Sequence, residues 1–162
     1  MRTERPRPAI RSTMTTDLVF VDTNVLIYAR DARNSDKMCC AQAWVLALGA
    51  RSTARINLQI LNELTRWILK NEARRSTEEV QEEMASLAVW GDRPLTQDEV
   101  EIAWAVRARL GYQWFDCLLL AAAVVHGCRY LLTEDMAHEA IFESVTLINP
   151  FRTSPDELFL RN

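Results

Sequence analysis

The sequence lacks the features of a membrane protein and of a disulfide-rich protein. Its longest apolar run, residues 118–125, is well short of the roughly 18 residues that a membrane-spanning helix needs. Its four cysteines form no Cys-x-x-Cys pair, so their spacing indicates neither a zinc site nor a disulfide framework. We therefore expect a soluble, cytoplasmic protein with four small buried cysteines, Cys39, Cys40, Cys117 and Cys128.

Positive charge is scarce outside the N-terminus. The chain has only two lysines, Lys37 and Lys70, and a formal net charge of −3. Residues 1–16 carry four arginines and one glutamate, a charge of +3, which leaves −6 for the rest of the chain. A protein with so acidic a body needs metal ions or a local basic patch to bring a polyanion close. The charge balance therefore favours a metal-dependent site over a purely basic groove.

Length and composition indicate one folded domain. The chain has 162 residues, of which 49% are hydrophobic, and this suffices for a single core. Residues 1–16 are rich in Arg, Pro and Thr, so we expect a disordered basic tail, with Met14 as an alternative start. We place the domain at residues 17–151 and expect residues 152–162 to form a C-terminal tail.

Short strand-like runs alternate with longer segments of helical periodicity. The apolar runs predict strands at residues 18–21, 54–58, 129–133 and 145–149. The helical spacing predicts helices at residues 24–30, 36–48, 59–70, 76–90, 96–110 and 114–126, with Gly49, Gly111 and Gly127 as C-terminal stops. This alternation is typical of the α/β class, with a central, mostly parallel sheet covered by helices on both faces.

Four acidic residues stand where these elements meet. Asp22 follows the first strand, Glu63 lies early in a helix, Asp116 is in the first turn of another helix, and Asp135 follows the strand at 129–133. In open α/β sheets, ligands bind at the carboxyl ends of the strands. Carboxylate oxygens are the ligands that hard cations such as Mg²⁺ and Mn²⁺ take. The sequence therefore predicts one metal site built from these acids.

Four sequence blocks surround these acids in order. They are Val-Asp-Thr-Asn at 21–24, Gln-Ile-Leu-Asn-Glu at 59–63, Trp-Phe-Asp at 114–116 and Gly-Cys-Arg-Tyr-Leu-Leu-Thr-Glu-Asp at 127–135. Together they resemble the PIN-domain family, and in particular the bacterial VapC-type toxin ribonucleases. Residues 148–151, Ile-Asn-Pro-Phe, are also similar to the endings of bacterial members. The resemblance covers residues 17–151.

The resemblance implies a metal-dependent endoribonuclease. Asp22, Asp116 and Asp135 would bind Mg²⁺ or Mn²⁺, and Glu63 would complete the catalytic set from the opposite side. The metal would lower the pKa of a bound water and neutralise charge on the phosphate, so that no histidine need act as base. Thr23 and Asn24 would orient Asp22 and the substrate, and Thr133 would do the same beside Asp135.

The resemblance also implies partners. RNA would be the substrate, a small antitoxin protein would hold the enzyme inactive, and a second copy would form a homodimer. The alternative function is a non-catalytic PIN-like module that binds RNA or a partner protein. Large apolar residues on two helices, Trp44 with Val45 and Trp67 with Ile68, exceed what a core of this size is expected to cover. We therefore expect part of this set to form an exposed patch.

Each acid has a structural alternative. Asp22 is also suited to cap the helix that follows it, and Asp135 could cap a helix from Met136. Glu63 could be a solvated helix residue, and Asp116 a plain first-turn acid. Glu134 is an alternative ligand to its neighbour Asp135.

The sequence does not fix the roles of three residues near its last blocks, Glu139, His138 and His126. Bacterial PIN proteins commonly carry a glycine shortly after the Thr-x-Asp block, where this chain has Glu139. Glu139 is expected either to adopt an ordinary backbone conformation or to add a fifth acid to the site. His138 is a candidate to approach the metal, whereas His126 is expected at a helix C-terminus, where the helix dipole favours it.

Aromatic and basic side chains offer candidate RNA contacts. The five tryptophans, Trp44, Trp67, Trp90, Trp104 and Trp114, have helical spacing, which favours core or interface positions over base stacking. Four arginines could guide RNA phosphates: Arg66, Arg107, Arg109 and Arg129. The alternative is that they are solvated surface residues, as arginines scattered along helices usually are.

Overall fold

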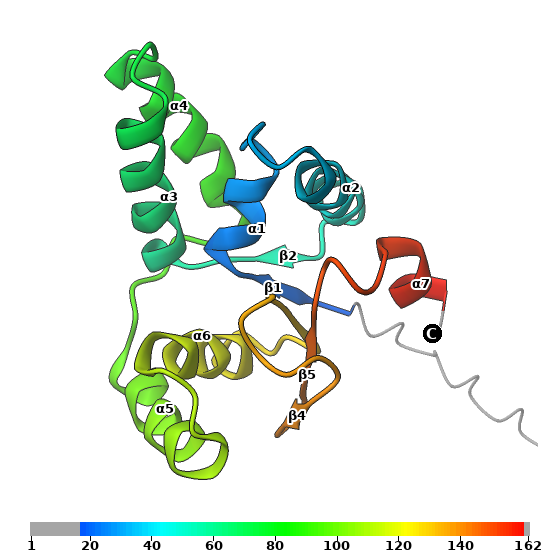
Figure 1. Cartoon of the computed structure of the whole chain (residues 1–162). Helices are drawn as coiled ribbons and strands as arrows, with labels where there is room; N and C mark the ends of the chain where they lie inside the picture. Colours follow the sequence, from blue (N-terminus) through cyan, green and yellow to red (C-terminus); the bar gives the residue numbers. More distant parts are fainter. Residues whose placement is uncertain (1–16, 161–162) are drawn as a thin grey trace, which may run out of the picture.

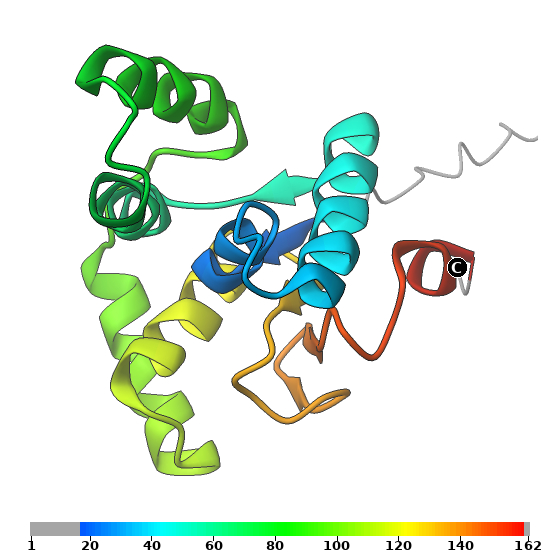
Figure 2. The ribbon, with the colours of Figure 1, turned by 45° about the horizontal axis from the view of Figure 1, so that its top comes forward.

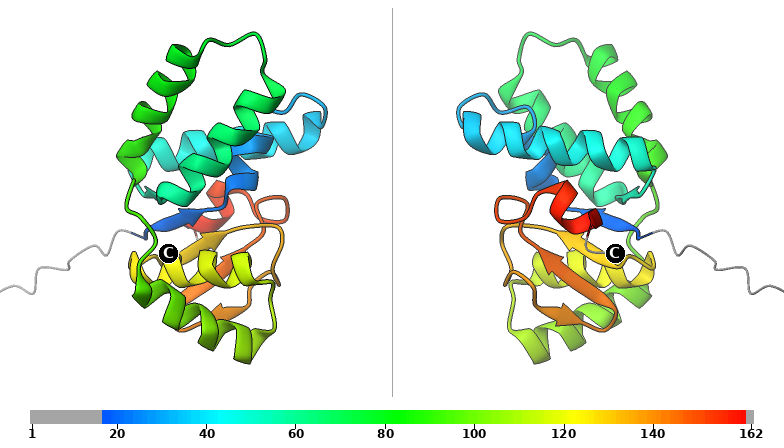
Figure 3. Two further views of the ribbon diagram at one scale, coloured as in Figure 1. Left: turned by 90° about the vertical axis from the view of Figure 1, so that its left-hand side faces the viewer. Right: turned by 90° about the vertical axis from the view of Figure 1, so that its right-hand side faces the viewer.

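The fold is a central sheet with helices on both faces. The computed structural model describes residues 17–160, so the tail expected at residues 1–16 lies outside the described residues. Helices α1 to α4 lie on one side of the sheet, and α5 and α6 lie on the other (Figure 1). The two further views in Figure 3 show the same layers edge on. The α/β class expected from the sequence is confirmed.

The sheet has five strands and is parallel except at one edge. The strands are β1 (Val19–Val21), β2 (Ala54–Arg55), β3 (Tyr130–Leu132), β4 (Ile141–Phe142) and β5 (Val145–Ile148). Their order is β2-β1-β3-β5-β4, and only β4 runs antiparallel to its neighbour. All three residues of β1 are fully buried. The backbone N–H of Asp22 donates to the carbonyl of Leu132 at 3.1 Å, which aligns the carboxyl ends of β1 and β3.

The helices largely follow the predicted segments. They are α1 (Thr23–Tyr28), α2 (Ser35–Arg51), α3 (Leu58–Asn71), α4 (Thr77–Leu87), the 3₁₀ turn η1 (Ala88–Trp90), α5 (Gln97–Leu110), α6 (Trp114–Val125) and α7 (Pro155–Leu160). The prediction that Gly49 ends its helix was wrong, because α2 continues to Arg51 and Ser52 takes the left-handed position with φ 56°. A single glycine costs a helix only about 1 kcal/mol.

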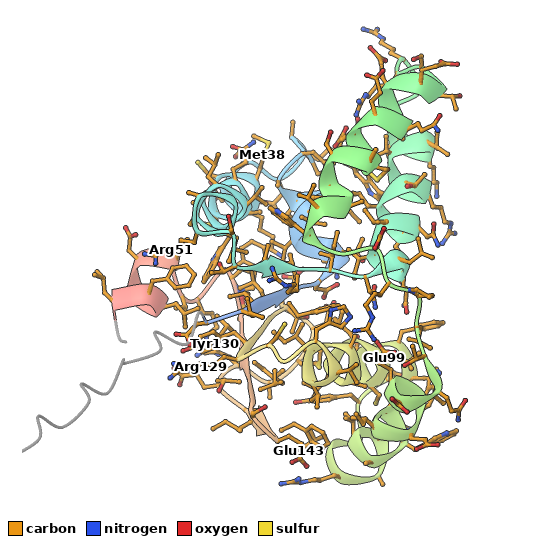
Figure 4. All side chains as sticks on the ribbon, turned by 180° about the vertical axis from the view of Figure 1, so that it is seen from behind. Met38, Arg51, Glu99, Arg129, Tyr130 and Glu143 are labelled. Carbon is orange, nitrogen blue, oxygen red and sulfur yellow. The ribbon has the colours of Figure 1, made fainter. Side chains whose placement is uncertain are left out.

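Residues 152–162 contain a helix where the sequence suggested a tail. Leu158 of α7 is buried, and the ring of Phe159 lies 6.2 Å from that of Trp44 in α2. The Trp44 indole N–H donates to the carbonyls of Pro150 and Thr153, at 3.1 Å each. Arg51 covers the Phe159 ring at 4.2 Å, beside α7 in Figure 4. These contacts fix α7 against α2.

The exposed apolar residues are not those that the sequence suggested. Trp44 and Ile68 are fully buried, so the expectation of an exposed patch was wrong for both. Trp104 is 60% exposed and its ring packs against that of Trp114 at 4.5 Å. The large hydrophobic residues that are exposed are Leu46, Leu58, Leu69, Val89, Trp104, Phe115, Ile141 and Leu160.

The cysteines divide into two pairs. Cys117 and Cys128 are buried, as expected, whereas Cys39 and Cys40 are exposed. The buried face of α2 is formed by Ala41, Trp44 and Leu48, so the two adjacent cysteines fall on its solvent side. All four are free thiols.

Helices α5 and α6 form a bent pair beneath the sheet. Gly111 ends α5 with a left-handed φ of 74°, and the Arg107 guanidinium donates to its carbonyl at 2.6 Å. Among residues 17–160, no single helix is long and apolar enough to cross a membrane. Only α5 and α6 together meet the length and composition, and a bend of 119° separates them.

An ion-pair network ties the α3–α4 pair to α1. Arg30, just after α1, contacts Glu72 at 2.6 Å and Glu83 of α4 at 2.5 Å. Arg75, in the loop between α3 and α4, pairs with the same two acids. Figure 1 shows α3 and α4 reaching away from the sheet, with α1 next to α3, and Figure 2 shows α3 nearly end-on. The network therefore sets the position of α3 relative to α1.

Glu139 adopts neither of the expected arrangements. Its φ is +63°, in the left-handed region that favours glycine, and its exposed side chain does not line the cavity that holds the other acids. Its N–H donates to the carbonyl of Leu147 in β5 at 2.7 Å. The turn before β4 therefore holds this residue in an unfavourable conformation.

We predict that Glu139→Gly is more stable than Glu139→Ala by about 1 kcal/mol, because glycine tolerates positive φ. Both variants lose the carboxylate, so the difference between them reports the strain of a Cβ at positive φ less the larger conformational entropy of glycine in the unfolded chain. Urea unfolding curves of the two variants measure it. An alanine variant as stable as the glycine variant would contradict a strained turn.

Candidate functional site

The four predicted acids line a single cavity. Asp22 follows β1, Glu63 lies in α3, Asp116 in α6, and Asp135 follows β3, yet all four border one cavity of about 170 Å³. The cavity lies where β1 runs into α1, with α3 and α6 on either side (Figure 1). Its other lining residues are Thr23, Asn24, Gln59, Ile60, Phe115 and Leu119. The parallel sheet thus brings together acids from four separate segments.

Asp22 is the buried acid of the group. Its residue is only 8% exposed, and its carboxylate accepts hydrogen bonds from the Thr133 hydroxyl at 2.8 Å and from the Asn24 N–H at 3.3 Å. The second bond makes it the N-cap of α1, so the capping role is real and coexists with a position in the cavity. Burial raises the pKa of Asp22 to about 7, and repulsion from Asp135 and Glu63 adds to the rise.

Polar neighbours hold Glu63 and Asp135. The Thr23 hydroxyl donates to Glu63 at 2.5 Å, and the Gln59 amide donates to the other oxygen of that carboxylate at 2.9 Å. The Asn24 amide donates to Asp135 at 2.7 Å. Thr23 and Asn24 therefore orient the outer acids with their side chains, whereas Thr133 binds Asp22.

Gln59 is a site residue that the sequence reasoning missed. It lies four residues before Glu63 in α3, a spacing that places two side chains on one helix face. That spacing could have identified it from the sequence.

Asp116 is the acid with the most freedom to turn. It is half-buried in the first turn of α6, and within the described residues its carboxylate has no hydrogen-bond partner. Burial raises its pKa, and repulsion from Asp135 contributes. Asp116 therefore has a carboxylate available for a ligand in the cavity.

The donor set suits a hard divalent cation. Neither histidine nor cysteine lines the cavity, and every charged lining atom is a carboxylate oxygen, which fits Mg²⁺ or Mn²⁺ better than zinc. In the described part of the chain, no three His, Cys, Asp or Glu side chains lie close enough together to hold an ion as they stand. Mutual repulsion and the bonds to Thr23, Asn24 and Thr133 keep the acids apart. The side chains would have to rotate to gather around an ion.

The two other candidate ligands, Glu134 and His138, lie outside the acidic cavity. Glu134 pairs with the Lys37 ammonium at 2.5 Å, and His138 accepts the Asn149 N–H at 3.1 Å; neither lines the cavity. No helix follows Asp135, so the reading of this acid as a helix cap was wrong. His126, at the C-cap of α6, lies 3.9 Å from the buried Glu99. Figure 4 labels Glu99 on α5.

Among the candidate phosphate-guiding arginines, Arg66 is the one beside the site. Arg107 binds backbone carbonyls at the end of α5, Arg109 lies 3.8 Å from Glu143, and Arg129 pairs with Asp17 at 2.9 Å. None of these three lines the acidic cavity, whereas Arg66 borders an adjoining one. The expectation for the other three has no support in these contacts.

Comparisons with known proteins agree with this fold. A family model described as PIN domain matches residues 19–141. A chain of a toxin–antitoxin complex from Klebsiella pneumoniae is similar, with 21% identity, a TM-score of 0.57 and coverage of 82% of this chain and 97% of that one. A chain of VapBC2 from Rickettsia felis, bound to a promoter DNA fragment, has 15% identity, a TM-score of 0.53 and coverage of 80% and 96%. The comparison with curated proteins gives no match.

We predict that the contribution of Asp22 to the stability of the metal-free protein falls as pH rises from about 4 to about 7. The pKa of Asp22 is about 7 in the folded protein against 3.8 as the ordinary value, so its contribution to stability is fully present below pH 3.8 and is lost as pH rises through 7. Asp22→Asn removes this loss. We expect it to stabilise the metal-free protein at pH 8 by up to about 4 kcal/mol and to have little effect at pH 4.

Urea unfolding of the wild type and the variant in EDTA, from pH 4 to pH 8, measures this dependence. Asp92→Asn, which removes the same charge from an exposed loop residue, is the matched control. If Asp22→Asn were the less stable protein at pH 8, Asp22 would be a structural residue rather than one held at a cost to stability.

Proposed function

The chain belongs to the PIN-domain family, and on this premise we propose that it is an endoribonuclease that hydrolyses RNA phosphodiester bonds with Mg²⁺ or Mn²⁺. The observation that carries the proposal is the single cavity lined by four carboxylates from four separate segments. A structural role does not account for this arrangement, because clustered acids repel and burial makes the ionised form of Asp22 costly. Such a cost is common at functional sites.

Each acid has a role in the proposed reaction. Asp22, Asp116 and Asp135 would hold the cation, and Glu63 would face it from α3. A divalent cation bound there would act as a Lewis acid toward the phosphate oxygens and would lower the pKa of an attacking water. Thr133 keeps Asp22 in place through its hydroxyl, and Asn24 keeps Asp135 in place through its amide. Thr23 and Gln59 orient Glu63.

We further propose that the enzyme is the toxin of a type II toxin–antitoxin pair. The two similar structures are a toxin–antitoxin complex and a VapBC complex, which supports a small antitoxin as partner. Exposed apolar side chains such as Phe115, 68% exposed, and Trp104 offer surface for an antitoxin or for a second copy in a homodimer. We propose the cytoplasm as its location.

We predict that Asp22→Asn abolishes Mg²⁺- or Mn²⁺-dependent RNA cleavage while the protein stays folded. Loss of one anionic ligand weakens binding of a hard cation, and we expect a decrease in rate of more than about 100-fold. Thr133→Val removes the hydrogen bond that the Thr133 hydroxyl donates to Asp22 and the one that it accepts from the Asp135 N–H, so we expect a loss of about 10- to 100-fold, as is typical for residues that orient ligands. Cleavage of a labelled RNA by the purified proteins measures both.

Glu134→Gln is the control for this series, because Glu134 is next to Asp135 but pairs with Lys37 outside the cavity. It should cleave at close to the wild-type rate. Full activity in folded Asp22→Asn, or cleavage that persists in EDTA, would rule out the metal site. RNA binding by a wild-type protein that never cleaves would instead favour a non-catalytic PIN-like module.

We predict that expression of the chain alone arrests growth and that co-expression with the protein of the neighbouring reading frame restores it. Asp116→Asn should be harmless alone, because its site cannot hold the cation, yet should still form the complex. Growth curves and co-purification measure the two effects. Harmless expression of an active wild type without a stable complex would remove the toxin assignment and leave a PIN nuclease.

A further inference from the structure

A second cavity adjoins the acidic one. It has a volume of about 380 Å³ and opens between α1 and α3. The two cavities share Thr23, Asn24 and Glu63, so one leads directly into the other. We call the second cavity the α1–α3 groove; beyond the shared residues, its lining is Ile27, Arg66, Trp67, Lys70 and Asn71.

One face of α3 links the acidic cavity to the groove. Glu63, Arg66, Trp67 and Lys70 are spaced at i, i+3, i+4 and i+7 within α3, so their side chains share one face of the helix. This face begins at a candidate metal ligand and continues with a cation, an aromatic ring and a second cation. The ion pairs of Arg30 with Glu72 and Glu83 link the end of α1 to the end of α3 and to α4.

The two cations of the groove are available to a ligand. Arg66 and Lys70 are exposed, and within residues 17–160 neither makes an ion pair or a hydrogen bond. The only other lysine, Lys37, is bound to Glu134. In a chain with net charge −3, two unpaired cations next to a group of acids create a local attraction for a polyanion. Arg66 and Lys70 thus form a local basic patch of the kind that can bring a polyanion close to an acidic protein.

Trp67 adds an apolar surface between these cations. It is half-buried, and the guanidinium of Arg33 lies 6.0 Å from its ring centre. Ile27 of α1 lines the opposite part of the groove. An aromatic ring flanked by cations is the arrangement that binds single-stranded nucleic acid, in which bases stack on aromatic side chains and phosphates lie near Lys or Arg. The cavity volume falls in the range of small-ligand pockets, about 300–1,000 Å³.

We propose that the α1–α3 groove binds the nucleotide next to the scissile phosphate of a single-stranded RNA, with its base against Trp67 and its backbone at Arg66 and Lys70. This inference rests on the proposed RNA cleavage at the acidic cavity. A single strand is required because the bases of a duplex are paired and stacked on one another and cannot reach Trp67. The groove thus selects unpaired RNA and aligns it with the carboxylates.

The test is steady-state cleavage of a fluorogenic single-stranded RNA 12-mer in Mg²⁺ by the full-length protein. The variants are the double substitution Arg66→Gln with Lys70→Gln, and Trp67→Leu, which keeps an apolar side chain but no ring. We expect KM to rise about tenfold or more for the double variant and about 5- to 150-fold for Trp67→Leu, with kcat within about twofold of wild type. In the double variant, the slope of log KM against log salt should fall by about 1.4, since each lost phosphate contact removes about 0.7.

Arg74→Gln is the matched control, because Arg74 is an exposed arginine just after α3 that lines neither cavity. Its KM and salt slope should equal those of the wild type. Trp67→Phe, which keeps a ring, should rescue most of the affinity lost in Trp67→Leu. An RNA hairpin whose stem contains the 12-mer sequence in fully paired form should be cleaved poorly by the wild type and by every variant.

Three results would overturn the proposal. Wild-type KM and salt slope in the double variant, with normal cleavage, would remove the RNA groove and leave the nuclease assignment intact. Wild-type RNA kinetics combined with lost binding of the co-expressed neighbouring protein would make the groove a protein-docking site. A wild-type protein that neither binds nor cleaves the RNA would remove the proposed function itself.

Discussion

Asp22 is a carboxylate buried at the end of β1, an inner strand of the sheet, and the rest of the site depends on how the free-energy cost of its charge is offset. Its pKa rises to about 7 because burial penalises the ionised form and because Asp135 and Glu63 repel it. Thr133 and the N-terminus of α1 offset only part of this cost. A cation among the acids would remove the repulsion, so the same arrangement that weakens the metal-free protein favours metal binding.

The fold explains why the acids meet. Parallel pairing of β1 with β3 places Asp22 and Thr133 next to each other at one end of the sheet. Asp135 follows Thr133 after β3, and the two flanking helices supply the other two acids, Glu63 from α3 and Asp116 from α6. The Arg30 ion pairs then fix α3 against α1, so the position of Glu63 and the shape of the adjoining groove are set by the same contacts. In the proposed reaction, substrate alignment and metal binding would therefore both depend on the position of α3.

The sequence predicted those features that arise from local patterns. Short buried apolar runs indicated β1, β3 and β5, and helical spacing with capping residues indicated the long helices. Asp22, Asp116 and Asp135 could be identified because each lies close to an element boundary, where a parallel sheet brings residues together. Glu63 lies inside α3 and was identified as part of one of the four sequence blocks. The gathering of the four acids around one cavity agrees with that reasoning.

Features that depend on tertiary contacts could not be predicted in this way. The helix α7 has a local signal, the reciprocal bonds of Ser154 and Glu157 at its start, but its packing on α2 through Phe159 and Trp44 joins residues far apart in the sequence. The strand β4 exists only as a two-residue partner of β5. Glu139 takes a glycine-like φ because the turn and its bond to Leu147 demand it. The pairing of Lys37 with Glu134 leaves Lys70 as the unpaired lysine beside the site, and only the three-dimensional structure shows this.

The central claim is that these four acids form one cation site, and a crystal structure from crystals soaked in Mn²⁺ tests it most directly, because anomalous scattering locates the ion. We predict a peak inside the cavity, bound by oxygens of Asp22, Asp116 and Asp135 directly or through water. An ion bound at another place, or a cavity without an ion at a Mn²⁺ concentration that supports RNA cleavage, would contradict the account.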